Sequence, residues 1–169
     1  MEGMSDTLSR KIPELVSQLA DKLLRNKLII STAESCTGGW ISQSLTAVAG
    51  SSKWFDSGFV TYSNAAKQRL LNVPESIFST DGVGAVSKEA VIAMADGAIN
   101  NSSANVSVAV SGVAGPDGGT LDKPVGIVWI AWQWQDKNMA KCFRFSGDRE
   151  AVRLATVIAA LEGVLALLD

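Results

Sequence analysis

The sequence predicts a single α/β domain in which a mixed, mostly parallel sheet is covered by helices on both faces, giving three layers. Helical and strand-like patterns alternate through the first two thirds of the chain. Two strand-like runs joined by a polar turn follow, and a long helix ends the chain. A length of 169 residues suits one domain with one apolar core, so we expect residues 1–169 to form a single unit.

The first predicted elements lead from the N-terminus into a turn. We expect residues 1–11 to be a loosely ordered segment. Residues 12–26 place leucine, isoleucine and valine on one stripe at helical spacing, which predicts an amphipathic helix. The apolar run 28–30 is typical of a buried strand, and residues 38–48 are expected to form a helix of about three turns.

The remaining elements alternate in type until a C-terminal hairpin. In order, they are a strand over 59–62, a helix capped by Ser63 and stopped by Pro74, a helix from Ser87 through Ala98, a strand over 106–110, strands over 125–134 and 139–145, and a helix over 148–168. The polar turn 135–138 joins the last two strands, which we expect to be antiparallel.

The composition restricts the chemistry more than it restricts the fold. The chain contains no histidine, which removes the commonest general base and the commonest metal ligand. Acid–base chemistry must therefore use Asp, Glu, Lys, Tyr or an activated thiol. Cys36 and Cys142 are far apart and form no CxxC pair, so we expect no zinc site, no disulfide framework, no other metal site and no cofactor.

Charge and hydropathy indicate the class of partner. With a net charge of −2, the chain lacks the excess of basic residues that is typical of nucleic-acid-binding proteins. The first residues lack the features of a secretory signal, and no uncharged apolar run is long enough to span a membrane. We therefore expect a soluble, cytoplasmic protein with a small-molecule partner, binding neither membrane nor nucleic acid; assembly into a homo-oligomer is left open.

Two polar, glycine-rich segments follow predicted strands, where open α/β sheets bind ligands. In the first, Thr32 to Gly39, a strand turns into a helix, and unpaired N–H groups there would suit a phosphate or an oxyanion. We therefore assign Thr37, Gly38 and Gly39 to the binding site. The alternative is that Ser35 or Thr37 is only the N-cap of the following helix.

The second segment, Ser111 to Gly119, contains four glycines and matches neither a P-loop nor GxGxxG. Because glycine permits close backbone approach, we interpret it as a ligand loop and assign Ser111, Gly112 and Gly115 to substrate binding. Arg149 could pair with a substrate phosphate, or simply with Asp148 or Glu150.

Three tryptophans lie in the strand-like run 125–134. We expect Trp129, Trp132 and Trp134 to pack on sheet faces or in a subunit contact, because no basic patch accompanies them.

Six motifs, read together, resemble the CinA C-terminal domain family. They occur in the family's order over roughly residues 12–168 and are Thr32–Gly39 (TAESCTGG), Ala49–Ser52 (AGSS), Gly58–Asn64 (GFVTYSN) with Lys67, Gly84–Ser87 (GAVS), Ser111–Gly119 (SGVAGPDGG) followed by Lys123–Gly126 (KPVG), and Gly147–Arg149 (GDR).

The resemblance implies an amidohydrolase that converts nicotinamide mononucleotide to nicotinate mononucleotide and ammonia in pyridine-nucleotide salvage. It implies a Ser/Lys mechanism in which Ser35 is the nucleophile, Lys67 is the base and Tyr62 assists. A histidine-free serine amidase needs another base, and lysine is an established one. Lys67 would then have to lose its proton near neutral pH, which burial would promote.

Two alternatives remain at this stage. The chain could be a non-catalytic nucleotide-binding or regulatory module, although the presence of both Ser35 and Lys67 favours an enzyme. Cys36 could be the nucleophile in place of Ser35, because a helix N-terminus lowers a thiol pKa; we favour a packing role for it.

Overall fold

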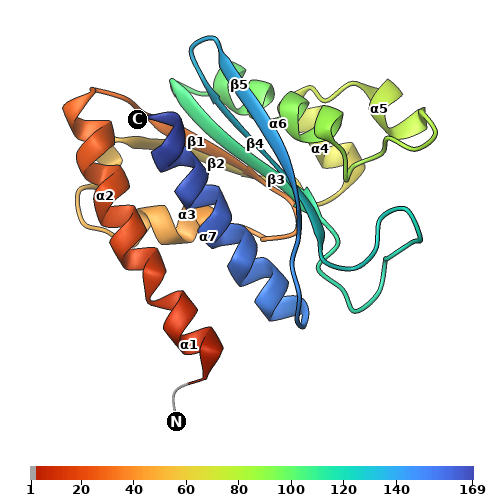
Figure 1. The fold of residues 1–169 in the computed structure, drawn as a ribbon. Helices are drawn as coiled ribbons and strands as arrows, with labels where there is room; N and C mark the ends of the chain where they lie inside the picture. Colours follow the sequence, from red (N-terminus) through yellow and green to blue (C-terminus); the bar gives the residue numbers. More distant parts are fainter. Residues whose placement is uncertain (1–2) are drawn as a thin grey trace.

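A five-stranded sheet forms the centre of the molecule, as the computed structural model of residues 3–169 shows (Figure 1). Its strand order is β2-β1-β3-β4-β5. The strands are β1 (Ile30–Glu34), β2 (Phe55–Val60), β3 (Val106–Gly112), β4 (Ile127–Trp134) and β5 (Lys137–Arg144).

The sheet is mixed, as predicted. β1 lies parallel to β2 on one side and to β3 on the other, whereas β4 is antiparallel to both β3 and β5. Trp134 pairs with Lys137, so the hairpin turn is shorter than the sequence suggested and consists of Gln135 and Asp136. Gln135 adopts a positive φ of 55° there.

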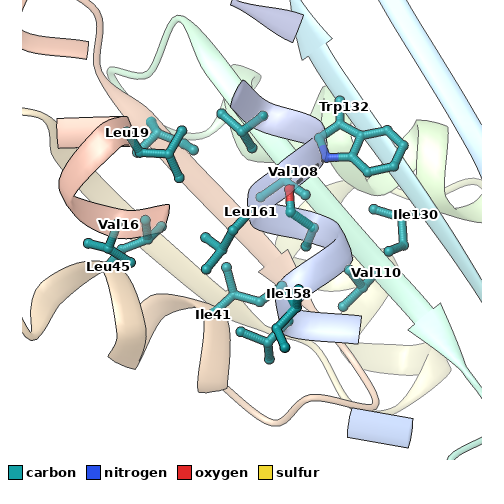
Figure 2. Packing of buried hydrophobic residues seen from close by; sticks show 14 of the residues in the cluster. Val16, Leu19, Ile41, Leu45, Val108, Val110, Ile130, Trp132, Ile158 and Leu161 are labelled. Atoms are coloured by element: carbon teal, nitrogen blue, oxygen red, sulfur yellow. Dashed lines mark hydrogen bonds between the residues drawn. The ribbon is translucent and has the colours of Figure 1, made fainter. Parts of the chain in front are cut away.

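Helices cover both faces of the sheet, which confirms the three-layer prediction. One face packs against α2 (Lys11–Arg25), α3 (Trp40–Thr46) and α7 (Arg149–Leu167), and Figure 2 shows the apolar side chains between them. The other face packs against α4 (Asn64–Leu71), α5 (Glu75–Ser79) and α6 (Lys88–Asn100).

Strand β3 shows why the two layers form as they do. Its valines at 106, 108 and 110 enter the core under α2, α3 and α7. Its alternate residues Ser107 and Ala109 face α6, and the Ser107 hydroxyl donates to the Ala95 carbonyl at 2.8 Å. A strand's side chains alternate between faces, so this one run of small and β-branched residues serves both layers.

The N-terminal segment corrects one expectation. Residues 1–11 were predicted to be loosely ordered, but α1 spans Met4–Ser9 and α2 already begins at Lys11; residues 1 and 2 lie outside the described part. Arg10 is both the C-cap of α1 and the N-cap of α2, so the two helices are nearly continuous. Leu8 packs against the core, a tertiary contact that a short periodic pattern does not reveal.

Several strand and helix boundaries also differ from the prediction. β1 begins at Ile30 and extends to Glu34, because Ser31 and Thr32 pair with β3 and are fully buried despite their polarity. β2 spans Phe55–Val60 and ends before Tyr62, and α5 had no predicted counterpart. These elements are stabilised by pairing and packing across the sheet, which override local propensity.

The tryptophans of β4 pack on the sheet as predicted. Trp132 lies in the core under α7, where its indole N–H donates to the Ala160 carbonyl at 2.9 Å and Gly163 leaves room for the ring. Trp134 packs on the same face, whereas Trp129 packs on the face that α6 covers.

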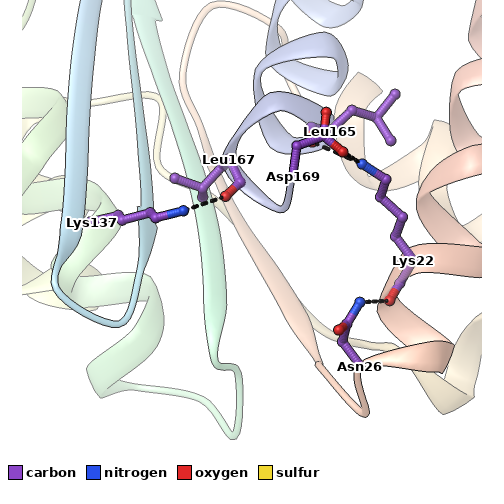
Figure 3. A network of polar contacts seen from close by, with 6 residues as sticks. All are labelled: Lys22, Asn26, Lys137, Leu165, Leu167 and Asp169. Carbon is purple, nitrogen blue, oxygen red and sulfur yellow. Dashed lines mark hydrogen bonds and ion pairs between the residues drawn. The ribbon is translucent and has the colours of Figure 1, made fainter.

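Lysines from two elements converge on the C-terminal end of α7 (Figure 3). Lys22 of α2 bonds the Leu165 carbonyl and pairs with the Asp169 carboxylate, and Lys137 of β5 bonds the Leu167 carbonyl. Cations at the negative end of the helix dipole stabilise this terminus. No helix in residues 3–169 has the length and apolar character needed to cross a lipid bilayer.

Candidate active site

A cavity of about 280 Å³ opens at the carboxyl ends of β1, β2 and β3. These strands are mutually parallel, so the segments that follow them meet at one edge of the sheet. The cavity is lined by Ser35, Cys36, Tyr62, Asn64, Lys67, Ala85, Val86, Ser111, Gly112, Val113, Ala114, Gly115, Asp117, Gly118 and Arg149.

Ser35 and Lys67 meet inside this cavity. The Lys67 Nζ lies 3.0 Å from the Ser35 Oγ and donates to the Tyr62 carbonyl at 3.1 Å. Ser35 directly follows β1, whereas Lys67 lies in the first turn of α4, whose start is fixed by the Ser63 hydroxyl accepting from Ala66 N–H. The Ser63 cap predicted from sequence therefore orients the helix that carries the lysine.

Burial favours the neutral, basic form of Lys67 by lowering its pKa. Its side chain is 1% exposed, and no carboxylate in residues 3–169 is within ion-pair distance. Desolvation lowers its pKa from 10.5 to about 8, because taking an ammonium out of water disfavours the charged form. About a tenth of the lysine is thus neutral at pH 7 and about half at pH 8, and the neutral form can accept a proton from Ser35.

Cys36 has the opposite character. Its side chain is buried in the core, and burial is the main reason that the pKa of its thiol is raised to about 11. A thiolate is therefore scarce at neutral pH, and this argues for Ser35 rather than Cys36 as the nucleophile.

The N-terminus of α3 does not offer the anion site expected from the turn, because the protein's own Glu34 occupies it. The fully buried Glu34 carboxylate accepts from Ile41 N–H at 2.8 Å, from Ser42 N–H at 3.0 Å and from the hydroxyls of Thr37 and Ser42. Neither Ser35 nor Thr37 caps the helix, since the N-cap is Gly39 at a φ of 103°.

The predicted binding residues of this turn consequently separate into two groups. Ser35 faces the cavity, whereas Thr37, Gly38 and Gly39 do not line it. Thr37 is fully buried, and its hydroxyl bonds Glu34 at 2.7 Å. Its side chain therefore stabilises the turn through Glu34.

The second glycine-rich segment supplies the opposite wall. Ser111, Gly112 and Gly115 all line the cavity, as does Asp117, to which the sequence analysis gave no role. Close packing within the chain already explains why glycine occupies positions 112 and 115. A β-carbon on Gly112 would lie 2.7 Å from the Ile127 carbonyl oxygen, and one on Gly115 would lie 2.5 Å from Val125.

Arg149 lies at the mouth and joins two of the walls. Its Nη1 donates to the Gly115 carbonyl at 2.7 Å and its Nη2 to the Tyr62 hydroxyl at 3.0 Å. It pairs with neither of the neighbouring carboxylates considered from sequence, and Asp148 instead caps α7 by accepting from Ala151 N–H. Apart from Lys67, Arg149 is the one cationic side chain among the cavity-lining residues.

Asn64, Ala85 and Val86 also line the cavity without having been assigned to it from sequence. All three lie within motifs already noted, GFVTYSN and GAVS, so the motifs were the available signal. Which side chain of a motif faces a cavity depends on the fold. Within residues 3–169 no group of three or more Cys, Asp and Glu side chains is placed to hold a metal ion.

Comparisons with known proteins agree on one family. The profile of the CinA C-terminal domain matches residues 13–168. A nicotinamide-nucleotide amidohydrolase of Pseudomonas putida is 54% identical over 92% of this chain and 96% of its own length. A protein of the same description from Escherichia coli K12 is 43% identical over 90% of this chain and 92% of its own.

Longer relatives and solved structures extend the comparison. A CinA-like protein of Colwellia psychrerythraea is 46% identical over 82% of this chain, which corresponds to 33% of that longer protein. The crystal structure of a competence/damage inducible protein from Agrobacterium tumefaciens superposes with a TM-score of 0.90 at 44% identity, covering 94% of this chain and 96% of that one.

Proposed function

The chain belongs to the CinA C-terminal domain family, and from that premise we propose that it is a nicotinamide-nucleotide amidohydrolase with a Ser/Lys mechanism. The reaction would convert nicotinamide mononucleotide and water to nicotinate mononucleotide and ammonia, in the cytoplasmic salvage of pyridine nucleotides. The observation that carries the proposal is the 3.0 Å contact between the Ser35 Oγ and a buried Lys67 Nζ inside a cavity.

The first half of the reaction forms an acyl-enzyme. Neutral Lys67 takes the Ser35 proton while Oγ attacks the carboxamide carbon, and the carbonyl oxygen becomes an oxyanion. The backbone N–H groups of Cys36 and Thr37 follow the nucleophile and are available to bind that oxyanion, since neither donates to a backbone carbonyl within the described chain. Protonated Lys67 then gives its proton to the departing nitrogen, and ammonia leaves.

The second half reverses the proton transfers. Lys67, neutral again, takes a proton from water as the water oxygen attacks the acyl carbon. The ester bond to Ser35 breaks, the serine recovers its proton from Lys67, and the carboxylic acid product releases its remaining proton to water and departs as the carboxylate. One lysine therefore serves both steps, which suits a site without histidine.

Tyr62 assists mainly through its backbone in this proposal. Its carbonyl oxygen accepts from Lys67 Nζ and therefore aims the amine at Ser35. Its ring is 60% exposed, and its hydroxyl bonds Arg149 at the cavity mouth, away from the serine–lysine pair. We assign the side chain to substrate entry rather than to proton transfer.

The phosphate of the substrate is assigned to Arg149, because the other lining cation, Lys67, must be neutral during catalysis. Ser111, Gly112 and Gly115 would contact the ribose between the two ends. Gly38, Gly39 and the Thr37 side chain keep only a supporting role in the turn, while the Thr37 backbone N–H serves the oxyanion.

The decisive test is ammonia release from nicotinamide mononucleotide by the purified protein, with Ser35→Ala as the matched inactive variant. We expect turnover in the parent protein and none in the folded alanine variant. Nicotinamide riboside, which lacks the phosphate, should be a much poorer substrate. No ammonia from the parent protein would favour the non-catalytic nucleotide-binding alternative, in which case the nucleotide should still bind.

A further inference from the structure

The turn that carries Ser35 is held from outside the cavity by an arginine of α7. The Arg153 Nε donates to the Cys36 carbonyl and its Nη2 to the Thr37 carbonyl, both at 3.1 Å. The guanidinium also lies over the ring of Trp40, the first residue of α3, with 5.6 Å between its central carbon and the ring centroid. The planar guanidinium group of Arg153 thus binds two consecutive carbonyls of the turn.

These bonds determine where the amide hydrogens point. In a trans peptide the C=O and N–H groups point in opposite directions, so a Cys36 carbonyl drawn towards Arg153 turns the Thr37 N–H away from α7. The Ser35 carbonyl accepts from Gly38 N–H at 3.1 Å within the turn, which directs the Cys36 N–H outward in the same way. Both N–H groups next to Ser35 therefore have no backbone acceptor within the described chain and are available to a ligand.

The turn needs such an external constraint. Gly38 and Gly39 adopt φ values of 61° and 103°, and glycine leaves the backbone free to take many other conformations. Glu34 holds one side of the turn through the Thr37 hydroxyl and the start of α3, but it contacts neither the Cys36 nor the Thr37 carbonyl. Arg153 is the side chain that binds those two carbonyls.

We propose that Arg153 is a positioning residue for the oxyanion donors. By binding the Cys36 carbonyl it holds the Thr37 N–H in the orientation that binds the oxyanion, and by binding the Thr37 carbonyl it holds the Gly38 N–H on the Ser35 carbonyl, which in turn orients the Cys36 N–H. It acts through the peptide groups and does not touch the substrate. Its positive charge beside the Cys36 carbonyl also polarises the Cys36–Thr37 peptide and strengthens the Thr37 N–H as a donor. This inference rests on the serine mechanism proposed above, so its test includes a reagent that requires that mechanism but not the nucleotide.

The experiment compares Arg153→Met and Arg153→Lys with the matched control Arg144→Met, which removes an exposed arginine on the edge strand β5. Two rates are measured for each protein: ammonia release from nicotinamide mononucleotide, and labelling of Ser35 by a fluorophosphonate. In labelling, Oγ bonds to phosphorus, fluoride leaves and the serine proton passes to Lys67, while the phosphoryl oxygen takes the oxyanion's place.

We expect Arg153→Met to lower kcat and the labelling rate in parallel, by about 10–100-fold, with KM within about threefold of the parent value. Loss of one whole oxyanion donor costs about 10²–10³, and misdirected donors should cost somewhat less. The pH midpoint should not move, because Lys67 keeps its surroundings. Arg153→Lys should lose less, and Arg144→Met should match the parent protein.

Ethylguanidinium added to Arg153→Ala should partly restore labelling, a rescue that a purely structural role would not show. Unchanged kcat and labelling in folded Arg153→Met would overturn the inference, as would a loss that vanishes when rates are divided by the titrated fraction of active sites. If Arg153→Met does not fold, Arg153→Lys decides between the same outcomes. A parent protein that is labelled but releases no ammonia contradicts the proposed substrate and leaves Arg153 testable by labelling.

Discussion

The pH dependence of the reaction tests the role of Lys67 most directly. Its pKa of about 8 means that roughly 10% of the free enzyme carries a neutral lysine at pH 7, half at pH 8 and about 90% at pH 9. Because only the neutral amine can accept the serine proton, kcat/KM should rise about tenfold from pH 6 to pH 7, about fivefold from pH 7 to pH 8, and level off above pH 9.

The variant Lys67→Arg distinguishes between two roles of Lys67, a general base and a cation that only binds phosphate. Arginine keeps the positive charge but cannot release its proton in a protein, so we expect kcat to fall by about 10²–10⁴-fold with substrate binding largely kept. The assay is ammonia release at saturating substrate from pH 6 to pH 10, with nucleotide binding measured separately by calorimetry.

Two results would refute this reasoning. One is a rate that does not change between pH 6 and pH 9 in a stable enzyme, since the fraction of neutral lysine changes about 100-fold over that range. The other is an arginine variant that keeps most of its kcat. Either would remove Lys67 as the base, and the Tyr62 phenol or a carboxylate would have to be tested in its place.

Four further variants have distinct expected outcomes. Lys67→Met should stabilise the fold by up to about 3 kcal/mol at pH 7 in urea unfolding, because a pKa lowered from 10.5 to about 8 is a cost of burial. The unfolded chain keeps the proton up to about pH 10.5, so this gain is complete below pH 8 and should disappear as the pH rises from 8 to 10.5; a constant gain would contradict it. Glu34→Ala should destabilise by about 3–5 kcal/mol, since it removes the acceptor of four buried or half-buried donors, of which the Ser42 hydroxyl keeps a second partner in Thr32; a loss under about 1 kcal/mol would show that the carboxylate is dispensable. Cys36→Ala should keep kcat within about threefold, whereas complete inactivity in a folded variant would make the thiol the nucleophile. Arg149→Met should raise KM for the nucleotide about 10–100-fold and leave the weak riboside reaction unchanged; equal effects on both substrates would exclude a phosphate contact.

Local pattern was sufficient for most of the fold. Helices α2, α4, α6 and α7 carry periodic apolar residues or a serine or aspartate cap, signals that lie within a few residues of one another in sequence. The missed boundaries have a common cause. Ser31 and Thr32 continue β1 because neighbouring strands pair with them, and α1 is accompanied by the packing of Leu8 on the core.

In the candidate site, too, local pattern identified some of the cavity-lining residues, and tertiary packing decided the others. Ser35, Lys67, Tyr62, Ser111, Gly112, Gly115 and Arg149 were assigned from sequence and all line one cavity. Their catalytic and binding roles stay predictions until the variants are measured. Thr37 and the two glycines after it were assigned to ligand binding because a helix N-terminus attracts anions, but Glu34 fills that position from within the chain. No local rule identifies a carboxylate that caps a helix beginning six residues later.

The sequence by itself determined the order of the elements, the exclusion of histidine chemistry and, through its motifs, the family to which the chain belongs. Only the tertiary structure decided which groups meet. Ser35 and Lys67 are 32 residues apart, and Arg153 contacts carbonyls more than 100 residues earlier in the chain. It also decided the protonation of Lys67, because the pKa of an amine depends on the water that surrounding residues exclude, and burial at the end of three parallel strands is a property of the packed sheet.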